Sequence, residues 1–177
     1  VFWRDRNTGV TKMISVTSTG EQGNGDCAEP SISADGQTVV FESKATNLVS
    51  GDNNNAKDIF LWRKSTNSIE LISKATNGAA ADAESFDASI SGNGNFVVFT
   101  SPATNLATVP KGRSLANIFL RDIQNGKTEM ISVDPVVKTG GNGYKGSISF
   151  DGSRISFCSP SGTLVANDKN NLWDIFL

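Results

Sequence analysis

The sequence predicts an all-β fold built from propeller blades, each with four short antiparallel strands. A Ser-Ile-Ser triplet recurs every 58 residues, at 31–33, 89–91 and 147–149. An Asp-Gly or Asn-Gly pair follows each triplet. Such a pair favours a tight hairpin turn, because these residues tolerate positive φ. No segment carries a convincing helical period. A fixed long period marks an array of equivalent supersecondary units, so the repeat predicts the fold class.

Each repeat is expected to contribute four strands in a fixed order, beginning with the triplet. The second strand is rich in β-branched and aromatic residues, which suit a buried pleated surface, and covers 38–43, 96–101 and 154–159. A long connection leads to the third strand, which starts at Ile59 or Ile118. After a second tight turn, the fourth strand covers 12–16, 70–74 and 129–133.

We interpret the chain of 177 residues as one repeat array, with repeats at approximately 1–58, 59–117 and 118–177. Three blades are too few for a closed propeller, which typically has about four to eight. The array is therefore a half ring or a fragment of a larger propeller. The apolar flat face of a terminal blade marks an association surface. We expect self-association or further repeats to complete the ring.

Composition and charge limit the classes of partner that the chain could bind. The 16 basic and 18 acidic residues form no block of like charge, which disfavours binding to nucleic acid or to an anionic membrane. No apolar run is long enough to enter a membrane as a helix. Histidine is absent, which removes the commonest general base and metal-ligating side chain.

The cysteines do not reveal the cellular compartment. Cys27 and Cys158 occupy non-equivalent repeat positions, so they do not indicate whether the chain works in an oxidising or a reducing compartment. No secretory signal is visible, but Val1 is not an initiator methionine, so a leader could be missing.

The blade pattern sorts the loops onto two faces, because successive antiparallel strands alternate in direction. Both kinds of tight turn fall on one face. The long connections fall on the other, which we call the long-loop face, at 17–29, 44–57, 75–87, 102–116, 134–146 and 160–173. Binding residues are usually carried by loops on a rigid scaffold, so any partner is expected on the long-loop face.

These motifs resemble the TolB-type propeller repeat, a relative of the WD-repeat propellers. The resemblance rests on the segment 30–36, the Val-Val-Phe strand after it, and 58–61 with Arg63. It covers essentially the whole chain and implies a β-propeller, commonly in a bacterial protein that works outside the cytoplasm. A periplasmic or extracellular location follows from the resemblance alone. The family includes binding scaffolds, propeller domains of peptidases and a few lyases, so it implies no single activity.

Two loops carry oxygen ligands at matching positions, with Asp, then Asn two residues later, then Asp six residues later. The six residues are Asp52, Asn54, Asp58, Asp168, Asn170 and Asp174. Such side chains could hold calcium, with backbone carbonyls and water completing the shell. Alternatively, they only cap turns through bonds to their own backbone. The middle repeat has Lys111, Arg113 and Asn117 at these positions, so no site is expected there.

Two aromatic residues lie in or beside the long loops, Tyr144 and Trp173, and could stack on a sugar or a peptide side chain. For Trp173, packing within the protein is favoured over contact with a ligand. Trp3 and Trp62 are expected to pack between blades. Three carboxylates have no acidic equivalent in the other repeats: Glu29, Glu42 and Glu84.

The sequence therefore favours a non-enzymatic propeller module that binds a protein or a glycan through its long-loop face. Two alternatives stay open. One is a secreted carbohydrate-active enzyme that uses loop carboxylates and calcium. The other is the gating propeller domain of a larger peptidase.

Overall fold

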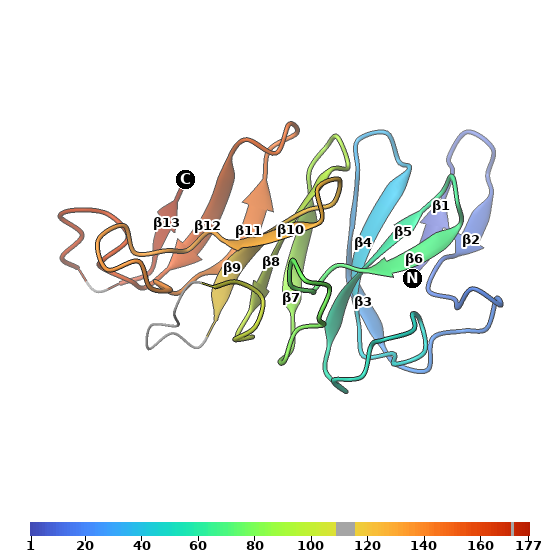
Figure 1. The fold of residues 1–177 in the computed structure, drawn as a ribbon. Coiled ribbons are helices and arrows are strands. Elements are labelled where there is room, and N and C mark those ends of the chain that lie inside the picture. Colours follow the sequence, from blue (N-terminus) through green and yellow to red (C-terminus); the bar gives the residue numbers. More distant parts are fainter. Residues whose placement is uncertain (109–115, 171) are drawn as a thin grey trace.

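The computed structural model describes residues 1–108, 116–170 and 172–177. These described residues form β-strands and no helix, and the strands build antiparallel sheets (Figure 1). The predicted all-β class is therefore confirmed. No helix long and apolar enough to cross a membrane occurs in the described residues.

Two sheets are complete four-stranded blades with strands in chain order. The first blade contains β3 (Cys27–Ile32), β4 (Thr38–Ser43), β5 (Asp58–Arg63) and β6 (Ser68–Leu71). The second blade contains β7 (Phe86–Ile90), β8 (Phe96–Ser101), β9 (Asn117–Asp122) and β10 (Lys127–Met130). A two-stranded sheet precedes them, with β1 (Phe2–Arg4) and β2 (Thr11–Met13). A three-stranded sheet follows them, with β11 (Tyr144–Ile148), β12 (Ile155–Ser159) and β13 (Asp174–Phe176).

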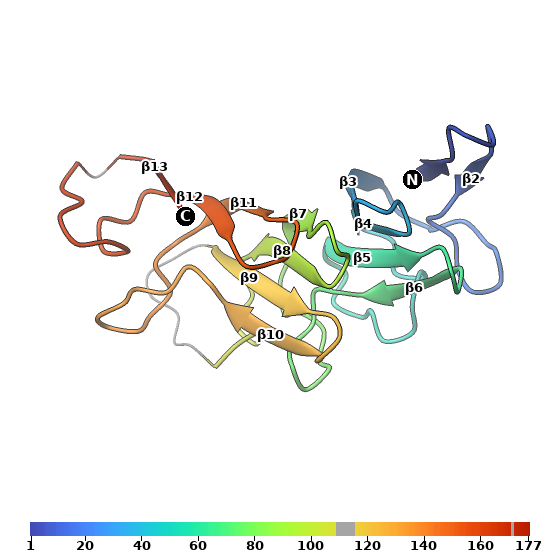
Figure 2. The ribbon, with the colours of Figure 1, turned by 90° about the horizontal axis from the view of Figure 1, so that it is seen from above.

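The four sheets stand side by side in chain order and form an open array (Figure 2). The first strands of neighbouring blades, β3, β7 and β11, lie next to one another along one edge of the array. The fourth strands, β6 and β10, lie on the opposite edge. This is the arrangement of propeller blades around an axis, with β3, β7 and β11 innermost.

Strand bounds follow the prediction closely for the second strand, and β5 and β9 begin one residue before the predicted start of the third strand. β4 and β8 have the predicted bounds, whereas β3 starts four residues before the Ser-Ile-Ser triplet. The predicted fourth strands lie too far along the sequence, since β6 was predicted to end at residue 74 and ends at Leu71. Beyond that residue the Ile72 amide donates to the carbonyl of Ile59, at 2.8 Å. The Ser73 hydroxyl accepts from the Ile59 amide and donates to the Asp58 carboxylate at the start of β5. The polar serine therefore ends the ladder that hydrophobic alternation alone would extend.

A bulge repeats in every inner strand and was not predicted. The register of β3, β7 and β11 shifts beside Glu29, Asp87 and Lys145, which have φ of 45°, 53° and 54°. A positive φ is costly for residues with a β-carbon. Its recurrence at one repeat position shows that the blade geometry imposes it.

The core lies between blades, where facing side chains fill the space between adjacent sheets. Ile59 and Leu61 of the first blade pack in one cluster with Phe99 of the second, and all three are fully buried. Each blade also stacks a phenylalanine pair on neighbouring strands, and in the second blade the ring centroids of Phe99 and Phe119 are 5.8 Å apart. Removing one such large side chain would cost several kcal/mol, on the order of 3–5.

The last blade leaves its corresponding face uncovered. Ile175 of β13 is 79% exposed, whereas its counterparts Ile59 and Ile118 are 0% exposed. Leu177 is 89% exposed, and its counterpart Leu61 is buried. In the first two blades, the blade that follows covers this position, so the exposed face has the shape and chemistry of a blade-to-blade contact.

The two tryptophans pack between sheets as predicted, with ring centroids 6.0 Å apart. They do not share a strand position, however. Trp3 lies opposite Lys12, whereas Trp62 lies opposite Ile69, one position further along. The β1–β2 and β5–β6 turns have the same length, so Trp3 stands at the position of Leu61 and not at that of Trp62.

The tight turns and the long connections separate onto two faces, as predicted. In Figure 1 the β3–β4 turn lies at the upper edge of the molecule and the 44–57 connection at the lower edge. Gly36, Gly94 and Gly152 in the first turns have φ of 68°, 73° and 79°, which confirms the predicted turn chemistry. Both cysteines are free thiols.

Candidate functional site

An Ala-Thr-Asn-Leu motif recurs at 45–48 and 103–106 and ties together the two long connections of each four-stranded blade. In the first blade, the Asn47 side chain accepts a hydrogen bond from the Asn24 amide at 2.9 Å. The same side chain donates to the carbonyl of Gln22 at 3.1 Å. Asn24 in turn accepts from the Thr46 amide at 2.8 Å. The connection before β3 and the connection after β4 are therefore linked on the long-loop face.

The second blade repeats this link with one acidic replacement. The Asn105 side chain accepts from the Asp82 amide at 3.1 Å and donates to the carbonyl of Ala80 at 2.7 Å. The Asp82 carboxylate accepts from both the amide and the hydroxyl of Thr104. Loops held in this way lose little conformational entropy on binding, so they offer a preorganised polar surface.

A groove opens where the second blade meets the connection that leaves the first. We call it the junction groove, and it is lined by 75–77, 105–108 and 127–130. Leu106 and Met130 give it an apolar floor, with exposed fractions of 1% and 8%. Asn77, Asn105 and Lys127 on its rim are exposed. An apolar floor with a few polar groups around it is typical of ligand-binding clefts.

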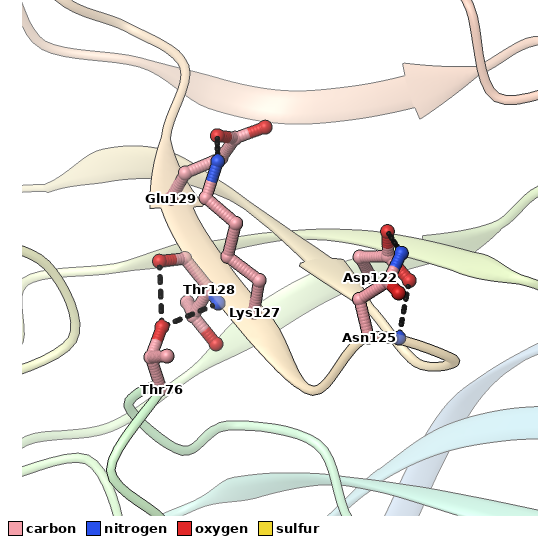
Figure 3. Close-up of polar contacts among 6 residues, drawn as sticks. All are labelled: Thr76, Asp122, Asn125, Lys127, Thr128 and Glu129. Atoms are coloured by element: carbon pink, nitrogen blue, oxygen red, sulfur yellow. Dashed lines mark hydrogen bonds and ion pairs between the residues drawn. The ribbon is translucent and has the colours of Figure 1, made fainter.

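Thr76 and Thr128 hold the groove together across the blade boundary. The Thr128 amide donates to the Thr76 hydroxyl at 2.9 Å, and that hydroxyl lies 3.3 Å from the carbonyl of Thr128 (Figure 3). The Thr128 hydroxyl donates to the carbonyl of Lys74 at 2.6 Å. Arg121, buried in β9, donates to that hydroxyl at 2.9 Å. Thr76 thus contacts the backbone amide and carbonyl of Thr128 in β10. These groups lie on an outer edge strand and would otherwise be available for pairing with another strand.

The rim of the groove carries a pair of opposite charges. The Lys127 ammonium lies 2.6 Å from the Glu129 carboxylate, and both side chains are largely exposed (Figure 3). This hydrogen bond raises the pKa of Lys127 above its usual value. At the neighbouring turn, the amide of Asn125 lowers the pKa of Asp122. Exposed ion pairs contribute little to stability, about 0–1 kcal/mol, so Lys127 and Glu129 are free to contact a ligand.

The predicted calcium residues of the first blade are brought together. Asp52 and Asp58 are 8% and 0% exposed, and the charge of Asp58 adds to burial in raising the pKa of Asp52. Asn54 behaves as a turn cap, because its side-chain oxygen accepts from the Ala56 amide at 2.8 Å. Its nitrogen donates to the carbonyl of Ala81 at 2.9 Å. Both carboxylates are buried, and Asn54 shapes the loop between them.

The second predicted copy is more open. Asp174 is partly buried and accepts from the Asn170 side chain at 3.1 Å, while the Asn170 amide lies 3.4 Å from Asp168. In the first blade, Ser73, which follows the fourth strand, bonds to the equivalent of Asp174, and the sheet of β13 has three strands. Of the middle repeat, 111–115 lies outside the described residues. Asn117 is described and buried.

Tyr144 and Trp173 lie against each other in the last blade. Their ring centroids are 5.3 Å apart with the planes tilted by 58°. Trp173 remains 61% exposed. Tyr144 is half-buried beneath it, and the pair lies outside the residues that line the junction groove.

Of the three candidate carboxylates, Glu42 has a structural role between blades. It is 2% exposed, forms an ion pair with Lys57 at 2.7 Å and accepts the Asp87 amide of the next blade. Glu29 and Glu84 are exposed. Glu42 is thus occupied by two structural partners, which makes it a poor proton donor to a substrate.

Sequence reasoning missed the junction groove, although part of its signal was visible. The Ala-Thr-Asn-Leu motif marked Asn105 and Leu106 as repeated, and Leu106 forms the floor. Lys127 and Met130 carry no motif of their own. They reach the groove because β10 passes beside 75–77, a contact between segments about 50 residues apart.

Comparison with known proteins identifies the fold. No protein-family model matches the chain, and no curated protein matches it. Among solved structures, TolB from Acinetobacter baumannii matches 97% of this chain at 20% identity with a TM-score of 0.50. The tricorn protease matches 89% at 14% identity with a TM-score of 0.54. An oligogalacturonate lyase in complex with manganese matches 98% at 11% identity with a TM-score of 0.50.

The chain has a TolB-type β-propeller fold. It spans 33% of that TolB chain, 39% of the lyase chain and 12% of the tricorn protease chain. At these identities the similarity concerns the TolB-type fold alone. Because that fold is shared by a protease and a lyase, the activity has to be argued from the sites of this chain.

Proposed function

We propose that this chain is a non-enzymatic propeller module that binds a protein or glycan partner through its long-loop face. The observation that carries the proposal is the junction groove, which combines an apolar floor with a polar rim. Two of its three lining segments, 75–77 and 105–108, belong to the long connections. The hydrogen bonds of Asn105 and Thr76 hold these connections in place.

The lining favours a peptide segment of a protein over a glycan in the groove. Its residues include no aromatic side chain on which a sugar ring could stack. Met130 instead offers a flexible apolar contact of the kind that accommodates varied side chains. Lys127 and Glu129 offer one charge of each sign to a polar peptide. The pair of Tyr144 and Trp173 is the better position for a glycan.

A location in the periplasm or outside the cell is part of the proposal, and it rests on the resemblance to TolB-type propellers. The enzyme alternative has weaker support from the described residues, since Glu42 serves the contact between blades. The gating role in a peptidase rests on analogy of fold alone.

A peptide array and a glycan array, probed with the purified chain, test the proposal. We expect selected peptides to bind, and Lys127→Ala to weaken that binding by at least about tenfold if the rim contacts the ligand. The matched control is Arg6→Ala, which removes an exposed positive charge from the turn between β1 and β2, outside the residues that line the junction groove. Equal loss in both variants would indicate a non-specific charge effect. Turnover of a glycan or peptide substrate that Glu29→Gln or Glu42→Gln abolishes would contradict the binding-only function.

A further inference from the structure

Two buried carboxylates in the first blade lack compensation for their charge. Asp52 lies in the connection after β4, and Asp58 begins β5. One oxygen of each, Oδ1 of Asp52 and Oδ2 of Asp58, is fully buried without a hydrogen-bond partner. Burying an ionised carboxylate without a partner is expensive, costing at least several kcal/mol. Two such carboxylates in one loop need a cation or a proton to offset their charge.

The remaining oxygen of Asp58 is held firmly. The Ser73 hydroxyl donates to Oδ1 at 2.5 Å and itself accepts from the Ile59 amide at 3.0 Å. These two hydrogen bonds fix the orientation of the Asp58 carboxylate and turn Oδ2 away from Ser73.

The loop between the two carboxylates is shaped in advance. The Asn54 side chain bonds to both Ala56 and Ala81, so it ties the loop to the connection that enters the second blade. Gly51 and Asn55 have φ of 96° and 53°, which lets the chain curl between Asp52 and Asp58. Several backbone carbonyls of a tightly curled loop can then turn toward one point.

The nearest lysine in the sequence does not neutralise the pair. The Lys57 ammonium lies 2.7 Å from Glu42 and 5.3 Å from the ring centroid of Phe86. The second blade supplies an internal comparison. Its Asn117 stands at the position of Asp58 and accepts from Ser132 at 3.0 Å, in the same geometry with the charge removed.

We propose that Asp52 and Asp58 bind a hard divalent cation, of which calcium is the best match. Calcium takes six to eight oxygen ligands in flexible geometry and readily uses backbone carbonyls and water. In the described residues no group of three or more His, Cys, Asp or Glu side chains gathers, so the two carboxylates would be the only charged ligands. A cation that also accepts backbone carbonyls and water therefore suits this site. Magnesium demands a stricter octahedron and is a poorer match. The cation would link the 44–57 connection to β5 and so stiffen the long-loop face.

Calcium titration of the purified chain tests this proposal, by calorimetry and by thermal unfolding after removal of metal with a chelator. A ligand that binds only the folded state raises Tm, by about 5–10 °C at roughly 100-fold above Kd for a chain of this size. We expect chelator to reverse the rise, and magnesium to produce a smaller one. Asp58→Asn, which copies Asn117, and Asp52→Asn should each abolish both the heat of binding and the shift in Tm.

The matched control is Asp26→Asn, which removes an exposed carboxylate from the connection before β3 and should leave the calcium response intact. If Asp58→Asn fails to fold, Asp52→Asn still decides the question, because Asp52 does not contact Ser73. The alternative to a cation is a proton shared by the two carboxyls. A Tm indifferent to calcium and chelator, with Asp52→Asn stabilising the chain in either condition, would establish that shared proton and overturn the cation site.

Discussion

The Glu42 carboxylate of the first blade accepts a hydrogen bond from the backbone amide of Asp87 in the second, at 2.5 Å. Asp87 is the bulged residue of the inner strand, with φ of 53°. The bulge turns its amide out of the β7–β8 ladder, and Glu42 reaches across the blade boundary to bind it. Burial together with the charge of Glu42 raises the pKa of Asp87. One side chain therefore couples a strained backbone to the contact between two blades.

Glu42→Ala is expected to lower the free energy of unfolding by about 2–4 kcal/mol, because the Asp87 amide would lose its acceptor and Lys57 its partner. Glu42→Gln keeps an acceptor oxygen and should cost less. Urea unfolding of both variants measures the difference. Glu84→Gln, at an exposed position, serves as the control and should change little. An unchanged stability of Glu42→Ala would show that the contact between blades does not depend on this bond.

The first-turn glycines should respond unequally to a β-carbon. Gly94 and Gly152 both have positive φ, so alanine at either is expected to cost on the order of 1 kcal/mol through backbone strain. At Gly152 the added carbon would also lie 2.2 Å from the Phe96 ring, whereas at Gly94 the nearest atom is 3.5 Å away. Thermal unfolding should therefore rank Gly152→Ala as less stable than Gly94→Ala. Gly94→Val should be less stable than the parent protein, and equal stability would contradict the turn conformation.

Stability should fall in acid partly through Asp151. The Ser149 hydroxyl donates to its carboxylate at 2.7 Å, and the amide and hydroxyl of Ser153 donate to it as well. These bonds hold the pKa of Asp151 well below its usual value of 3.8. Because the folded-state pKa is the lower one, the stabilisation is complete above the unfolded-state pKa and is lost as pH falls below it.

Asn93 occupies the same position in the second blade and accepts from the Ser91 hydroxyl at 2.7 Å. Asp151→Asn should therefore keep the turn and flatten the dependence of stability on pH between about pH 5 and pH 2. Asn93→Asp should steepen it. Urea unfolding at several pH values compares the two variants with the parent. Parallel pH profiles for all three proteins would rule out this contribution.

The 177-residue chain is expected to associate through the uncovered face of its last blade. Ile175 is 79% exposed where Ile59 and Ile118 are covered by the blade that follows. The partner is therefore expected to be another propeller blade, supplied by a second copy of the chain or by further repeats. Two chains would place six blades around a two-fold axis, the commonest symmetry of homo-oligomers.

Light scattering at micromolar concentration should give a mass above that of one chain. Ile175→Lys should shift the species toward a single chain, because it buries a charge in the contact. Val136→Lys, at a loop position that is 83% exposed, should leave the mass unchanged. A well-folded species with the mass of one chain in the parent protein would refute this assembly.

Much of the fold could be predicted from the sequence because it depends on short-range chemistry. The 58-residue period, the glycine turns and the bounds of β4 and β8 depend on residues within one hairpin. The sorting of the loops onto two faces then follows from the alternation of strand direction. The early start of β3 escaped prediction, because a bulge at Glu29 interrupts the hydrophobic alternation by which a strand is recognised.

The sequence by itself determined the blade, its turns and the positions of the candidate ligands Asp52 and Asp58 in one loop. Only the tertiary structure decided that both carboxylates are buried, that Glu42 serves a neighbouring blade and that Lys127 and Met130 share a groove with Leu106. The physical reason is distance along the chain. Turn and strand preferences act among neighbouring residues, whereas burial and charge compensation depend on which blade faces which, and packing between sheets establishes that contact only when the whole array forms.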